Sequence, residues 1–108
     1  MHIIKQSDLF PPIDEIVKDE NNVVVDVTGA TIAFSMRKAR DPTSIKINLA
    51  VGSVTNGPLG KIRYQMAGTD TDTPGTYQAE FRVTPAAGNP MRVPTDGYIT
   101  VVVEEKVG

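Results

Sequence analysis

Apolar and polar residues alternate along five stretches of the sequence, and this alternation limits the fold more than any other feature. A period of two places every second side chain on one face of a β-strand, as a strand with one buried face requires. The pattern predicts that Ile45, Ile47, Leu49 and Val51 all face the core, and similar sets recur elsewhere. The five stretches are residues 30–37, 45–52, 61–66, 77–84 and 98–103.

Turn-forming residues separate these stretches. Typical turn sequences are found at Thr28-Gly29, Asn56-Gly57-Pro58, Thr73-Pro74-Gly75 and Asp96-Gly97. Two further strands are expected near Pro12–Lys18 and Val23–Val27. Short strands joined by turns predict an all-β fold, an antiparallel β-sandwich or small barrel of about seven strands. We expect one domain over residues 1–108, with residues 1–12 as an N-terminal arm.

Composition excludes several classes of function. The chain has a net charge of −2 with both signs spread along it, so no basic face favours nucleic acid or an anionic membrane. It has no cysteine, which excludes disulfides, thiolate zinc sites and a cysteine nucleophile. No apolar stretch approaches the ~20 residues of a membrane span, and the first ten residues lack the apolar region of a signal peptide. We expect a protein that is made and used without Sec export.

The sequence offers no catalytic constellation. His2 is the only histidine, and next to the initiator methionine we expect it to be an exposed terminal residue. The serines of the chain therefore have no histidine other than His2 that could act as their general base in a Ser-His-Asp arrangement. Asp70 and Asp72 are too few for a calcium loop, which needs six to eight oxygen ligands, and nothing marks them as an acid–base pair. We predict a non-enzymatic protein with no cofactor and no metal.

The stretch TDTDTPGTYQAEF, residues 69–81, instead resembles the entry to the late strand of immunoglobulin-type sandwiches. That entry carries a tyrosine corner, in which a tyrosine hydroxyl bonds a backbone group a few residues upstream. The resemblance implies that Tyr77 makes this bond. Asp72 would accept hydrogen bonds from turn amides, while Pro74 fixes one φ angle and Gly75 permits an unusual one. Ala79 stands where an antibody domain has its disulfide cysteine.

Three segments in order resemble the small immunoglobulin-like domains of tailed-bacteriophage virion proteins, above all the N-terminal domain of the baseplate upper protein family. They are VVVDVTGATIAFSMR (23–37), GKIRYQMAGTDTDTPGTYQAEFRVT (60–84) and RVPTDGYITVVVEE (92–105). The resemblance implies an immunoglobulin-like sandwich, a location in the virion after synthesis in the host cytoplasm, and other virion proteins as partners. That family continues into a long C-terminal region, whereas this sequence ends at Gly108, so we expect an accessory subunit of tail, neck or capsid.

Two segments are candidate contacts in a homo-oligomer or a virion lattice. The first is the extended arm with Leu9, Phe10, Pro11 and Pro12, which could also lie on its own domain. The second is the closing strand, apolar on both faces around Thr100, where Tyr98 and Val102 need cover.

The alternative function is a stand-alone carbohydrate- or surface-binding module that uses Tyr64, Tyr98 and the turns near Asn56 and Asp96. The basic cluster Met36–Arg40 is expected to be a solvated strand end that pairs with Asp41 and Glu80, and the alternative is a site for an anion or DNA.

Overall fold

The computed structural model describes residues 1–86, 88–95 and 97–107, with the backbone but not the side chain of Pro42. These residues form β-strands, turns and irregular segments, and the described part contains no helix. The nine strands within it are β1 His2–Lys5, β2 Ile13–Ile16, β3 Thr31–Lys38, β4 Asp41–Val51, β5 Ser53–Asn56, β6 Lys61–Tyr64, β7 Gly75–Thr84, β8 Met91–Val93 and β9 Ile99–Glu104. The all-β prediction is confirmed.

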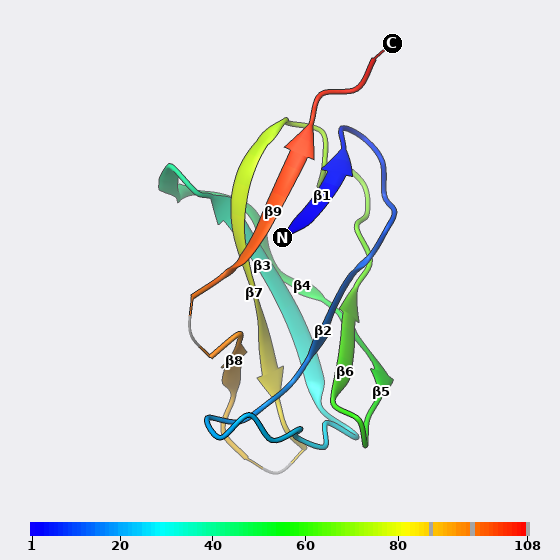
Figure 1. Ribbon diagram of the computed structural model, residues 1–108, viewed down its shortest axis with the longest axis vertical. Coiled ribbons are helices and arrows are strands. Elements are labelled where there is room, and N and C mark those ends of the chain that lie inside the picture. The colour runs from blue at the N-terminus through cyan, green and yellow to red at the C-terminus, as the bar shows by residue number, and fades with distance from the viewer. Residues whose placement is uncertain (87, 96, 108) are drawn as a thin grey trace.

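The strands form two sheets that lie on either side of one core (Figure 1). The larger sheet has the order β1-β9-β7-β3-β4, and β8 pairs with β7 on the edge that β9 also uses. The smaller sheet has the order β2-β6-β5. All pairings are antiparallel except that of β1 with β9, so the first and last strands of the described chain lie side by side.

The alternation predicted from the sequence fills the core in most strands. Ile32, Phe34 and Met36 of β3 are buried, as are Tyr77, Ala79, Phe81 and Val83 of β7. In the other sheet, β6 buries Ile62 and Tyr64. The rings of Phe34 and Tyr64 stack across the two sheets at 4.4 Å between centroids with an interplanar angle of 6°, which gives the core a direct contact between its two layers.

The chain enters β3 through a tight turn. The Asp26 carboxylate accepts hydrogen bonds from the Thr28 N–H at 2.9 Å and the Thr28 hydroxyl at 2.6 Å. Gly29 follows with a φ of +76°, a conformation that favours glycine. These contacts hold the pKa of Asp26 below its ordinary value, because both hydrogen bonds favour the charged carboxylate.

The chain passes from the large sheet to the small one at Gly52, between β4 and β5. A Cβ at this position would lie 2.8 Å from Ile32 Cγ2 and 3.0 Å from the Arg63 carbonyl oxygen. Only glycine fits this close approach without displacing a neighbour.

Four expectations from the sequence differ from the structure. The segment Val23–Val27 is not a strand and makes only an isolated bridge between Lys18 and Val24. Residues 2–5 of the predicted arm form the strand β1, which was not expected there. The short strands β5 and β8 were not predicted, because three or four residues are too few for an alternating pattern to show. The fourth difference is the register of β4.

The strand β4 does not point all its predicted residues at the core. Ile47 is buried, whereas Ile45, Leu49 and Val51 are exposed. The pairing of β3 with β4 shifts register three times, and Leu49 has a φ of +53°. Because a bulge adds a residue to one strand, it reverses the alternation beyond it, and Ala50 takes the inward position expected for Leu49.

Candidate interaction surface

The predicted tyrosine hydrogen bond is present at the start of β7. The Tyr77 ring is fully buried, and its hydroxyl donates to the Thr73 carbonyl oxygen at 2.6 Å. Gly75 has a φ of +153°, which residues with a side chain rarely adopt. The pKa of Tyr77 is raised, mainly because burial disfavours the phenolate. The hydrogen bond ties the start of β7 to the loop that precedes it.

The role predicted for Asp72, which was to accept hydrogen bonds from turn amides, belongs to Asp70 instead. Asp70, and not Asp72, caps the turn: its carboxylate accepts from the Ala67 N–H at 2.9 Å and the Tyr64 hydroxyl at 2.6 Å. Asp72 accepts from the Lys46 ammonium group and from the Thr73 hydroxyl. The hydrogen bond from Lys46 is the main reason why the pKa of Asp72 lies below its ordinary value.

His2 is half-buried in β1, not exposed as predicted from its terminal position. Its Nε2 is buried and has no hydrogen-bond partner among the described residues. Burial lowers its pKa, since the charged imidazolium loses solvation. In the described ranges, no group of three or more His, Cys, Asp or Glu side chains is placed to hold a metal ion. No helix of the described chain is long and apolar enough to cross a membrane.

The N-terminal arm lies on its own domain. The Ser7 N–H donates to the Thr71 carbonyl at 2.9 Å, the buried Thr71 hydroxyl donates to the Asp8 carbonyl at 2.7 Å, and the Gln65 amide donates to the Leu9 carbonyl. Among the four predicted contact residues, Leu9 packs against the core, Pro12 is half-buried and Pro11 is exposed. Phe10 is 71% exposed, so the arm presents one aromatic ring to solvent.

The closing strand β9 has one covered face and one open face. Val101 and Val103 are buried in the core. On the other side Thr100 is exposed, Tyr98 just before the strand is exposed, and Val102 is half-buried. Ile3 of β1 lies opposite Val102 in the ladder and is itself exposed.

Five large apolar side chains are exposed on the outer face of the six-stranded sheet, with those of β1 and β4 at opposite edges. This face carries large hydrophobic residues from three places in the sequence, each between 42% and 87% exposed: Ile3, Ile45, Leu49, Val51 and Tyr98. Single exposed hydrophobics are ordinary, whereas several on one sheet face favour an interaction surface. The sequence pattern assigned three of them to the core, because no local signal marks the bulge that turns β4 over.

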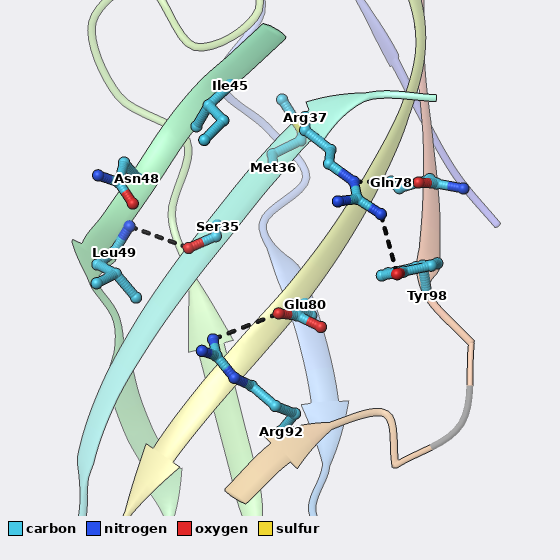
Figure 2. A pocket seen from close by; sticks show the side chains of 10 residues that line it. All are labelled: Ser35, Met36, Arg37, Ile45, Asn48, Leu49, Gln78, Glu80, Arg92 and Tyr98. Atoms are coloured by element: carbon cyan, nitrogen blue, oxygen red, sulfur yellow. Dashed lines mark hydrogen bonds and ion pairs between the residues drawn. The ribbon is translucent and has the colours of Figure 1, made fainter. Parts of the chain in front are cut away.

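A groove of about 250 Å³ lies on this face between β4 and Tyr98 (Figure 2). Its floor comes from β3 and β7, which supply Ser35, Arg37, Gln78 and Glu80. Ile45 and Leu49 border it on the β4 side. The Leu49 N–H donates to the Ser35 hydroxyl at 3.0 Å, which holds the bulge of β4 against the floor.

Polar contacts order the charged groups of the groove. The Arg37 guanidinium donates to Gln78 Oε1 at 3.2 Å and to the Tyr98 hydroxyl at 2.9 Å, and its Cζ lies 5.0 Å from the centre of the Tyr98 ring. Arg92 forms an ion pair with Glu80 at 3.3 Å. The prediction that the basic cluster pairs with Glu80 is therefore wrong for Arg37, whose partners are Gln78 and Tyr98.

The residues predicted for a carbohydrate site do not come together. Tyr64 is 5% exposed and stacks on Phe34 in the core, whereas Tyr98 lies on the outer face of the opposite sheet. Asn56 caps the β5–β6 turn through the Leu59 N–H at 3.2 Å. Asp96 lies outside the described residues. Among the described residues of this set, only Tyr98 borders the groove.

Comparison of the chain with protein-family models, with curated proteins and with solved structures gives no match.

Proposed function

We propose that this chain is a non-enzymatic structural subunit of a tailed-phage virion that acts through protein–protein contacts. The observation that carries the proposal is the outer face of the six-stranded sheet, which exposes Ile3, Ile45, Leu49, Val51 and Tyr98. Three of these, Ile45, Leu49 and Tyr98, border an ordered polar groove. Such a face favours burial against another protein. The resemblance of residues 23–37, 60–84 and 92–105 to phage virion domains supplies the biological setting.

We further propose that the all-β fold is an immunoglobulin-like sandwich. In variable-type immunoglobulin domains one sheet contains strands G, F, C and C′, and the other contains B, E and D. The order β9-β7-β3-β4 supports the first assignment, and β2-β6-β5 supports the second. The buried Tyr77, at the start of the strand that would be F, occupies the place of a tyrosine corner.

The virion proposal is tested with particles from a phage that encodes the chain. Mass spectrometry of gradient-purified virions should detect the protein at a fixed ratio to a major capsid protein. A phage that lacks the gene can be complemented either with the wild type or with Leu49→Arg. Particles made with the wild type should contain the protein, and particles made with Leu49→Arg should lack it. Absence of the protein from purified infectious particles would refute the proposal.

A second candidate function, carbohydrate binding, is favoured by one feature of the groove. Tyr98, Gln78, Glu80 and Asn48 place an aromatic ring beside planar polar groups, a combination that suits sugar hydroxyls. Titration of the ¹⁵N-labelled protein with host cell-wall saccharides tests it. Saturable shifts confined to β3, β4 and β7 would support this function, and unchanged spectra would exclude it for the saccharides used.

A further inference from the structure

We propose that the groove on the outer face of the six-stranded sheet binds an acidic segment of a partner protein. A carboxylate of that segment would pair with Arg37, and an apolar side chain close to it would pack on Ile45 and Leu49. This inference rests on the proposed function as a subunit that acts through protein contacts, and it adds the chemistry of the partner.

The outward positions of β3, β7 and β8 carry an excess of positive charge. Among the described side chains at these positions, the charged ones are three arginines, Arg37, Arg82 and Arg92, and one carboxylate, Glu80. Arg82 and Arg92 lie directly opposite each other in the β7–β8 ladder, and Glu80 pairs with Arg92 at 3.3 Å. The patch is therefore positive although the whole chain has a net charge of −2. It attracts an acidic partner and disfavours a basic one.

Arg37 is the cation of this patch that is best prepared to meet a carboxylate. Its guanidinium donates to Gln78 Oε1 at 3.2 Å and to the Tyr98 hydroxyl at 2.9 Å, and its Cζ lies 5.0 Å from the centre of the Tyr98 ring (Figure 2). Both partners are uncharged, and a guanidinium has more N–H donors than these two bonds use. Because the contacts order the side chain before binding, less conformational entropy is lost when a carboxylate docks.

The apolar border of the groove lies next to this cation. Ile45 of β4 is directly opposite Arg37 in the β3–β4 ladder, and Arg37 is directly opposite Gln78 of β7. Ile45 is 59% exposed, and Leu49 on the same border is 42% exposed. Side chains two residues apart on an extended segment share one face. An acid at one position and an apolar residue at the other would therefore reach Arg37 and the border together.

The size of the groove favours a few side chains of a larger partner. Its volume is about 250 Å³, below the roughly 300–1,000 Å³ of sites that enclose a small molecule. Tyrosine and arginine, which stand together here as Tyr98 and Arg37, are enriched among the residues that anchor protein interfaces. These features match a segment that places an acidic and an apolar side chain in the groove and continues over the sheet.

The two edges of the sheet are less suited to a partner segment than this face. At one edge, β1 has four residues, and its Lys5 carbonyl already accepts the Asp8 N–H at 3.0 Å. At the other edge, the ladder of β4 with β3 shifts register at three places. Bulges of this kind protect an edge from strand addition. The partner would therefore bind through side chains in the groove and not as an added strand.

Selection of short random peptides displayed on yeast against the full chain tests the preference for an acidic segment. The enriched peptides should contain Asp or Glu within two positions of an apolar residue. A synthetic copy of an enriched peptide, capped at both ends to remove its terminal charges, is then titrated by fluorescence anisotropy. Replacement of its acidic residues by the corresponding amides should weaken binding by about 10-fold or more.

Variants of the chain locate the site. Arg37→Gln and Ile45→Asp should each weaken binding of the acidic peptide by about 10-fold or more, since one removes the charged donor and the other places a negative charge beside it. The matched control is Lys61→Gln, which removes the same charge from an exposed position of β6 in the other sheet. It should change the affinity by less than about 2-fold, because salt screens distant charges. Thermal unfolding of each variant should show a native-like transition.

The outcomes separate this inference from the virion role. No enrichment, enrichment of basic or uncharged peptides, or equal binding by the wild type and Arg37→Gln would overturn the proposal. Tighter binding of a heparin fragment or a DNA oligonucleotide than of any selected peptide would also overturn it, because a polyanion needs the arginines but not the apolar border. The presence of the protein in virions is measured independently, so failure of either proposal leaves the result of the other unchanged.

Discussion

Tyr77 combines a ring with no exposed surface and a hydroxyl that donates to the Thr73 carbonyl at 2.6 Å. Tyr77→Phe keeps the ring but leaves that carbonyl without its donor. We expect a loss of about 1–2 kcal/mol in the free energy of unfolding, measured by urea denaturation. Tyr98→Phe removes a surface bond to Arg37 and should cost less than about 0.5 kcal/mol. Equal losses in the two variants would argue against a structural role for the corner.

Tyr64 makes the stability of the folded protein depend on pH in the alkaline range. Burial, and then the hydrogen bond to Asp70, raise the pKa of Tyr64 far above its ordinary value of 10. The unfolded chain therefore loses this proton more readily than the folded one. The contribution of Tyr64 to stability is complete below about pH 10 and is lost as the pH rises from there toward the pKa of the folded state.

The variant Tyr64→Phe isolates this effect. It keeps the stack on Phe34 and removes the titrating hydroxyl, so it should be less stable than the wild type at pH 7 by about 1–3 kcal/mol, because Asp70 loses a donor. Above pH 10 the difference between the two proteins should shrink. Urea midpoints measured from pH 7 to 11 test this, and a constant difference over that range would contradict it.

At the scale of elements, β4 gives a test of register. Alternation predicts that Ile47 and Leu49 contribute alike, whereas the structure buries Ile47 to 5% exposure and leaves Leu49 at 42%. Ile47→Ala should cost about 2–4 kcal/mol in the free energy of unfolding of the monomer, and Leu49→Ala less than about 1 kcal/mol. Measurements at concentrations where the wild type is monomeric avoid a contribution from association. Similar costs for both would mean that the strand runs without the bulge.

β3, β7 and β4 show what sequence alternation reveals and what it misses. In β3 and β7 every second side chain is apolar and the ladders are regular, so the buried set follows from the pattern. The bulge at Asn48 and Leu49 depends on a hydrogen bond to Ser35, a residue 14 positions away, and no local sequence signal encodes such a contact. β1 has the same difficulty, since four residues become a strand only because β9 lies beside them.

The candidate surface was predictable only in part for the same reason. Tyr98 and Thr100 follow from a closing strand that is apolar on both faces, and both are exposed. No local sequence signal separates Tyr64 from Tyr98, yet Tyr64 is 5% exposed in the core and Tyr98 is 47% exposed on the outer face. The groove joins residues of β3, β4, β7 and β8 with Tyr98, which lies just before β9. It can be located only once the order of these strands is known.

At the scale of the whole molecule, the two ends of the described chain close the large sheet together. β1 pairs with β9 in parallel, Ile4 is 3% exposed in the core, and Lys5 forms an ion pair with Glu104 at 3.1 Å. Because this pairing joins segments about a hundred residues apart, the sheet cannot be completed until both are available, and folding should be slow, on the order of milliseconds to seconds.

Removal of residues 1–5 tests this closure. The shortened chain loses Ile4 and exposes Val103, and β9 becomes an edge strand. We expect the free energy of unfolding to fall by about 3 kcal/mol or more and aggregation to increase, since an unpaired strand edge accepts other chains. As a control, a chain that ends at Glu104 loses only exposed residues of the described part and should change by less than about 0.5 kcal/mol. If both truncations are equally well tolerated, β1 does not contribute to the stability of the domain, and its apolar outer residue Ile3 cannot be part of a fixed face.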